Sequence, residues 1–140
     1  MKVQRCLAGA AAASAGALLL LAAPAVAHHS NAPFYDSANR VEMQGTITKF
    51  VFMNPHAFLF IDALDAQGKT INWQIELGAP ISLRRTGWTP DTMKAGTEVK
   101  VTGSRSRAEG TFGMCCARIT RLDGSPITPG GRVQEESVPR

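Results

Sequence analysis

The sequence lacks the features that mark several large functional classes. It contains no Ser-His-Asp spacing, no nucleophile elbow and no glycine-rich phosphate loop. It also lacks an extended cluster of Lys and Arg residues of the kind that contacts a nucleic-acid backbone. We therefore expect a protein that is not an enzyme and that does not bind nucleic acid. No internal repeat is present either.

A long, strongly apolar run is also missing. Residues 7–23 are apolar or small throughout, but they are rich in Ala and Gly, whereas a membrane-spanning helix needs roughly 20 strongly apolar residues. Lys2 and Arg5 precede this run, and the tripeptide Ala-Val-Ala at residues 25–27 follows it. This three-part pattern is typical of a cleavable secretory signal peptide. We predict a signal peptide over residues 1–27, a periplasmic location, and no transmembrane segment after cleavage.

Signal cleavage would change both the size and the charge of the chain. Removing 27 of the 140 residues leaves 113, which suits one domain with a modest core. Losing Lys2 and Arg5 reduces the basic residues from 15 to 13 against 11 acidic residues, so the formal net charge falls from +4 to about +2. The cleaved chain is thus only weakly basic.

Cysteine is scarce. After Cys6 leaves with the signal peptide, only the adjacent Cys115 and Cys116 remain. Neighbours on a strand point to opposite faces of the sheet, so these thiols are not expected to bridge each other without a strained backbone. We expect one buried cysteine packed as a small hydrophobe and one nearer the surface. An intermolecular disulfide and a thiolate metal ligand are the alternatives.

Period-2 alternation of apolar and polar residues dominates the remaining chain and predicts β-strands. A first strand is expected over residues 41–52. The dipeptide Asn-Pro at residues 54–55 ends it, because Pro cannot donate to a strand ladder. Strands over residues 56–64 and 70–77 follow, with a turn at residues 65–68 between them.

The pattern changes after the third strand. Pro80 near a helix start and Gly87 just past its end predict one short helix over residues 81–86. A fourth strand is expected around residues 99–101 and a fifth over residues 112–122.

Three strands, a short helix and two further strands form the element order of an OB-type barrel. We therefore predict a mainly β fold, a five-stranded OB-like barrel over residues 41–128 with one short helix between the third and fourth strands. An extended segment at residues 28–40 would precede the barrel, and a flexible tail at residues 129–140 would follow it. A small β-sandwich is the main alternative.

All three histidines of the sequence, His28, His29 and His56, would survive signal cleavage. At a new N-terminus, His28 would carry a free α-amine, whose ordinary pKa is about 7.7–8.0, so that a metal ion can displace its proton near neutrality. Paired amine and imidazole nitrogens suit Cu(II) best among divalent ions. If residues 28–40 fold back along the first strand, His28 reaches the turn that carries His56. We predict a metal site of these three histidines, with Cu(II) the favoured ion.

Two other residues are accessory candidates for this site, namely Asp36 and Met53. The alternative is that the His-His-Ser start is an unstructured tail and that Asn-Pro-His at residues 54–56 is only a structured turn.

Arg84, Arg85 and Trp88 form a second candidate site. An aromatic ring beside guanidinium groups can line a groove that recognises a saccharide or a peptide, whereas Trp88 can equally cap the end of the barrel. Because OB-type barrels commonly present one face to an oligomer, sugar or peptide, the alternative function is a non-metal binding module for a peptide, a saccharide or a periplasmic protein.

Several motifs occur together along the chain, namely His-His-Ser at residues 28–30, residues 45–50, Asn-Pro-His at residues 54–56, Trp73 with Glu76, residues 85–88 and residues 94–99. Together they resemble a group of small exported proteobacterial proteins that is catalogued only as a domain of unknown function. The resemblance implies export and a small β domain, and it implies no activity, substrate or catalytic residue. Adjacent cysteines are not associated with that group, which argues that Cys115 and Cys116 do not carry a function shared across it.

Overall fold

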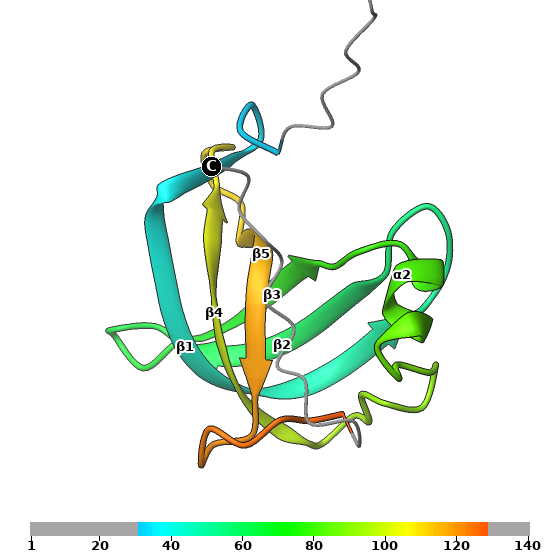
Figure 1. Ribbon diagram of the computed structural model, residues 1–140. Coiled ribbons are helices and arrows are strands. Elements are labelled where there is room, and N and C mark those ends of the chain that lie inside the picture. The colour runs from blue at the N-terminus through cyan, green and yellow to red at the C-terminus, as the bar shows by residue number, and fades with distance from the viewer. Residues whose placement is uncertain (1–30, 129–140) are drawn as a thin grey trace, which may run out of the picture.

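The computed structural model describes residues 31–128 (Figure 1). The predicted signal peptide, His28, His29 and the predicted tail lie outside the described residues. Among the described residues, no helix is long and apolar enough to cross a membrane. The elements are, in chain order, β1 (Tyr35–Val51), β2 (Phe58–Leu64), β3 (Thr70–Glu76), α2 (Pro80–Arg85), β4 (Glu98–Ser106) and β5 (Gly113–Thr120).

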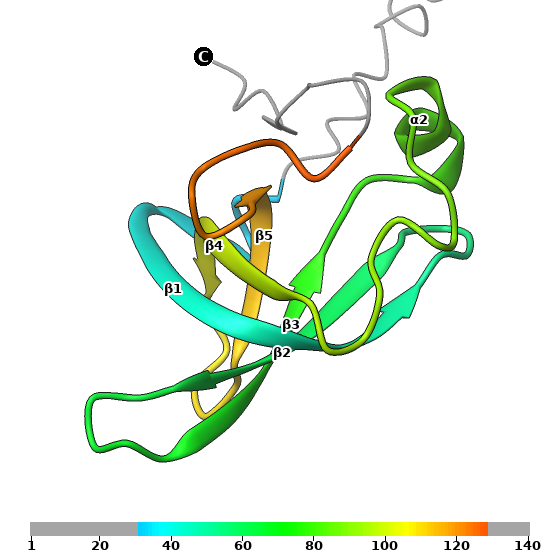
Figure 2. The ribbon, with the colours of Figure 1, turned by 90° about the horizontal axis from the view of Figure 1, so that it is seen from below.

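The five strands close into a barrel in the order β1-β2-β3-β5-β4, and β4 pairs back onto β1. Every pairing is antiparallel except that of β3 with β5, which is parallel and short. The single helix α2 stands beside the barrel, between β3 and β4 in the chain (Figures 1 and 2). The predicted mainly β fold, with five strands and a short helix after the third, is confirmed.

Strand β1 is longer than predicted and follows a different path at its start. It begins at Tyr35 rather than at Val41, and its first residues pair with the end of β4, Tyr35 opposite Ser106. The metal hypothesis assumed that residues 28–40 fold back along the first strand. Residues 35–40 instead extend β1. Most of these residues are polar and exposed, so alternation of apolar residues could not predict this part of the strand. It forms a strand because it pairs with the end of β4. Figure 1 shows β1 curving around the barrel as a result.

The core is built from the inward-facing apolar residues of all five strands together with the chain after α2. Trp88 belongs to this core: only 2% of its surface is exposed, and its ring lies 6.1 Å from that of Phe50. Gly87, at a φ of 88°, turns the chain directly after α2, and the Trp88 backbone N–H donates to the Leu83 carbonyl. Trp88 thus caps the barrel and does not line a surface groove.

The two arginines of the second candidate site remain exposed. The guanidinium group of Arg84 lies over the Phe52 ring, 5.1 Å from its centre. Trp88 is buried in the core, as the capping alternative expected, so of the second candidate site only Arg84 and Arg85 contribute to the surface.

Candidate functional site

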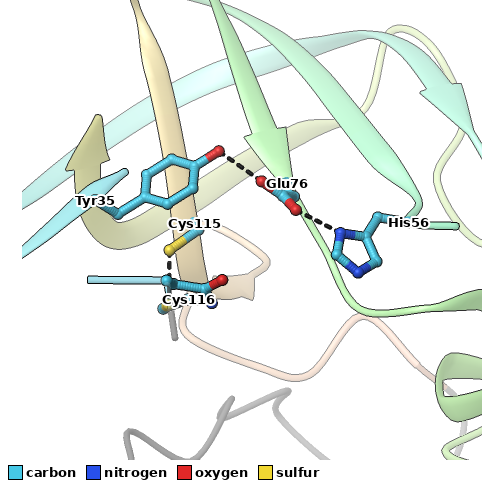
Figure 3. Close-up of polar contacts among 6 residues, drawn as sticks. Tyr35, His56, Glu76, Cys115 and Cys116 are labelled. Atoms are coloured by element: carbon cyan, nitrogen blue, oxygen red, sulfur yellow. Dashed lines mark hydrogen bonds and ion pairs between the residues drawn. The ribbon is translucent and has the colours of Figure 1, made fainter. Parts of the chain in front are cut away.

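One end of the barrel gathers three polar side chains from distant parts of the chain. Glu76 is the last residue of β3, Tyr35 is the first residue of β1, and His56 lies between β1 and β2. Figure 3 shows the three side chains in one row, with the Glu76 carboxylate in the middle. We call this group the barrel-end cluster.

The Glu76 carboxylate has a separate partner for each of its oxygens. His56 Nδ1 lies 2.5 Å from Glu76 Oε1, and the Tyr35 hydroxyl donates to Glu76 Oε2 over 2.6 Å. The Glu76 side chain is 23% exposed, whereas that of His56 is 47% exposed. A carboxylate bonded on both sides is fixed in orientation, and so is the imidazole that depends on it.

Strand pairing explains why His56 meets Glu76. Phe58 stands opposite Glu76 in the antiparallel β2–β3 pair, and backbone hydrogen bonds between Ala57 and residues 77–78 continue this ladder beyond β2. His56 therefore falls on the same face as Phe58, one diagonal step from Glu76, within reach of a long side chain. The peptide bond between Asn54 and Pro55 in the preceding turn is cis.

The environment of Tyr35 keeps its hydroxyl protonated. Burial, the hydrogen bond to Glu76 and the charge of that carboxylate together raise the pKa of Tyr35 far above its ordinary value of 10.0. Tyr35 consequently acts as a hydrogen-bond donor to Glu76 throughout the physiological pH range.

A cavity of about 900 Å³ opens beside the cluster. Its wall contains Tyr35, His56, Glu76 and Cys115. Asn31, Pro33 and Phe34, from the first described part of the chain, also line it. Arg107 holds that segment in place, since its Nε donates to the Ala32 carbonyl over 3.0 Å and its backbone N–H donates to the Phe34 carbonyl over 2.8 Å. The chain thus enters the fold along the wall of this cavity.

The cluster presents one imidazole nitrogen for chemistry. Because Nδ1 of His56 faces Glu76, Nε2 points away from the carboxylate (Figure 3). A histidine whose second nitrogen is held by a carboxylate is the usual arrangement of a metal-binding histidine, and the carboxylate raises the basicity of the ligand. Within residues 31–128 no group of three or more His, Cys, Asp or Glu side chains could hold a metal ion.

Neither accessory candidate joins the cluster. The Asp36 carboxylate forms an ion pair with Arg107 over 3.2 Å. Met53 is 61% exposed and lines a different, shallower cleft with Phe52 and Ile81. Of the predicted metal ligands, the structure describes only His56 in a suitable setting.

Sequence reasoning missed Tyr35 and named Glu76 only among the motifs that carry the family resemblance. A signal for Glu76 was present, because an acidic residue at the end of a strand faces the turn that begins the neighbouring strand. No local signal marks Tyr35, since its meeting with Glu76 depends on the closure of the barrel through β4.

Comparison with known proteins places the chain in a family but adds no function. Searches of the curated proteins and of the solved structures found no match. Residues 15–115 match a family of unknown function, DUF6152. The matched range is more than half of the chain and contains all three members of the barrel-end cluster. The chain therefore belongs to this family of unknown function.

Proposed function

We propose that this protein is an exported periplasmic binding protein, and not an enzyme, that holds a transition-metal ion at the barrel end. Copper is the favoured ion. The ligands are Nε2 of His56 together with His28 and His29 at the N-terminus left by signal cleavage. The observation that carries the proposal is the bond between Glu76 and His56 Nδ1, which presents Nε2 as a ligand beside an open cavity.

The position of Asn31 supports a contribution from the N-terminal histidines. Asn31 lines the same cavity as His56, and His28 precedes it by only three residues. Three residues span at most about 11 Å. A tether of this length from Asn31 in the cavity wall allows His28 and His29 to reach the cavity, by a route that needs no folding back along β1.

The donor set that would result favours copper. An α-amine and two or three imidazoles supply nitrogen ligands only, and nitrogen-rich sites bind Cu(II) more tightly than the other common divalent ions. The α-amine becomes a ligand only when His28 is the first residue. Affinity should accordingly depend on cleavage after Ala27.

The test is a Cu(II) titration of the protein purified after export, with the His28 N-terminus verified by mass. We expect His56→Ala and His28→Ala each to weaken binding strongly. Glu76→Gln, which keeps the size of the side chain but weakens its hold on the imidazole, should weaken binding about 10- to 100-fold. Glu42→Gln is the matched control, because Glu42 is a carboxylate with two partners outside the cavity, and it should leave the affinity unchanged.

Two results would count against the proposal. If affinity is indifferent to His56→Ala, the N-terminal histidines chelate metal by themselves and the barrel takes no part. If one extra residue before His28 leaves affinity unchanged, the α-amine is not a ligand.

A second candidate function is a non-metal binding module for a peptide, a saccharide or a periplasmic protein. One observation favours it: Met53 and Ile81, each 61% exposed, line a shallow cleft with Phe52 and Arg84 beside α2. This surface takes the place of the predicted Trp88 groove. Copper binding that is weak and indifferent to His56 would make this cleft the better candidate.

A further inference from the structure

The adjacent cysteines lie in an irregularity of β5. Thr102 of β4 stands opposite Arg118 of β5, whereas Ser104 stands opposite Cys115. Two steps along β4 thus correspond to three steps along β5, so β5 holds one extra residue, which defines a β-bulge. Cys116 lies in this bulge with a φ of 54°, the left-handed conformation that one type of bulge requires.

The bulge reverses the expected arrangement of the two side chains. On a regular strand the thiols would point to opposite faces, but here Sγ of Cys115 lies 2.7 Å from Sγ of Cys116 (Figure 3). The expectation that these neighbours point apart is therefore wrong, and its cause is the backbone at Cys116. The expectation about burial is confirmed, since Cys115 is 2% exposed and Cys116 is half-buried.

The fold, and not the preference of cysteine, imposes this conformation. A non-glycine residue with positive φ is uncommon, and Cys116 is the one such residue that the described part of the chain contains. Strand pairs with β4 flank the bulge on both sides. The left-handed backbone at Cys116 and the close approach of the two sulfur atoms are thus already present while both side chains are thiols.

We propose that Cys115 and Cys116 are a site of covalent modification and form a vicinal disulfide when the folded protein meets a disulfide oxidant. The thiolate of Cys116, the more exposed of the two, attacks the oxidant R–S–S–R and releases one R–SH. Cys115 then attacks the mixed disulfide and releases the second R–SH. The two cysteine sulfurs lose two electrons, and the two thiol protons leave with the released thiols.

The surroundings of the pair fit this order of events. The Asn31 side-chain amide donates to Cys116 Sγ over 3.6 Å. Cys115 lines the barrel-end cavity, so that the bridge would form in the cavity wall. The predicted export would bring the pair into an oxidising compartment, where disulfides persist. The chemistry needs no bound metal, and only its setting in an oxidising compartment rests on the proposed export.

The experiment compares the folded protein with a synthetic peptide of residues 108–118, the tryptic fragment that carries both cysteines. Both are equilibrated with the same series of oxidised and reduced glutathione mixtures, thiols are blocked by alkylation, and the fragment is identified by mass after digestion. This map also separates Cys6, should it be present, from the pair. We expect an internal disulfide in the folded protein at a glutathione ratio at least tenfold more reducing than the peptide requires.

Four outcomes would overturn the proposal. The first three are recovery of the doubly alkylated pair at every ratio, arrest at a glutathione adduct, and a covalent dimer on a non-reducing gel. The fourth is a folded protein that oxidises no more readily than the peptide, because the bulge would then contribute nothing. Cys115→Ser sharpens the mechanism: its Cys116 should form the glutathione adduct and proceed no further.

Discussion

Two carboxylates of this barrel have the same number of partners and differ in their surroundings. Glu42 on β1 accepts from Lys100 over 2.8 Å and from Thr102 over 3.2 Å. Glu76 on β3 has His56 at 2.5 Å and Tyr35 at 2.6 Å. The side chain of Glu42 is 55% exposed, whereas that of Glu76 is 23% exposed. Counting bonds alone would make the two sites equivalent.

Exposure to water separates them. Water can replace either partner of Glu42, and dissolved salt screens its attraction to Lys100. Water has less access to Glu76, so its bonds are stronger and their loss leaves partly buried groups without partners. The comparison teaches that a carboxylate fixes a neighbouring side chain when water has little access to it. At Glu76 water does not easily replace His56 or Tyr35 as a hydrogen-bond partner.

Replacing Glu76 by Ala should give the largest effect on stability. The substitution removes the partner of both His56 and Tyr35 and leaves the partly buried Tyr35 hydroxyl unsatisfied, which costs about 1–3 kcal/mol. Urea unfolding at neutral pH measures this change in the free energy of unfolding. The double variant with His56→Ala completes a thermodynamic cycle, and we expect a clear coupling energy between the two residues. Additive losses would mean that the bond between them contributes nothing to stability.

The alkaline titration of Tyr35 should show a smaller but more specific effect. Tyr35 is the sole tyrosine of the sequence, so the phenolate absorbance of the protein reports on this residue alone. Because the pKa of Tyr35 is raised in the folded state, its contribution to stability is complete below the ordinary value of about 10. It is lost as the pH rises from there through the folded-state pKa.

Phenolate should accordingly appear at a higher pH in the folded protein than in the protein unfolded in urea. Glu76→Gln should move the folded-state titration to lower pH, since it removes one negative charge and weakens the hydrogen bond that favours the phenol. Identical titrations of the folded and unfolded protein would show that Tyr35 is freely solvated. The matched variant Glu42→Gln should leave the curve unchanged.

The sequence was sufficient to predict the barrel because the fold follows from local patterns. Alternation in β3 and the Pro80 and Gly87 signals around α2 are carried by neighbouring residues. The start of β1 was missed because polar residues 36–40 become a strand only through pairing with β4. For Trp88 the sequence left a groove and a cap as alternatives, and the turn at Gly87 together with packing against Phe50 decides for the cap.

The candidate site was predicted only in part, because local patterns reveal a residue but not its partners from other strands. His56 stood out because histidine is rare in this sequence and because it follows an Asn-Pro turn. Its partners Glu76 and Tyr35 come from other strands, so only the register of β2 with β3 and the closure of β1 onto β4 bring them together. The approach of the two cysteine sulfurs depends on a single left-handed residue in β5, which strand periodicity cannot anticipate.

Glu42 should show the smallest effect of the three predictions, and its size tests the comparison directly. The hydrogen bond from Lys100 is the main cause that lowers the pKa of Glu42 below 4.5. A lowered pKa in the folded state contributes stability above the unfolded value, and this contribution is lost as the pH falls through the folded value. Since more than half of the Glu42 side chain is exposed, we expect Glu42→Gln to shift the urea midpoint only marginally at neutral pH.

High salt should abolish that shift, because exposed charges are screened, whereas the loss caused by Glu76→Ala should persist in high salt. If the two substitutions proved equally costly and equally sensitive to salt, exposure would not be what distinguishes the two carboxylates.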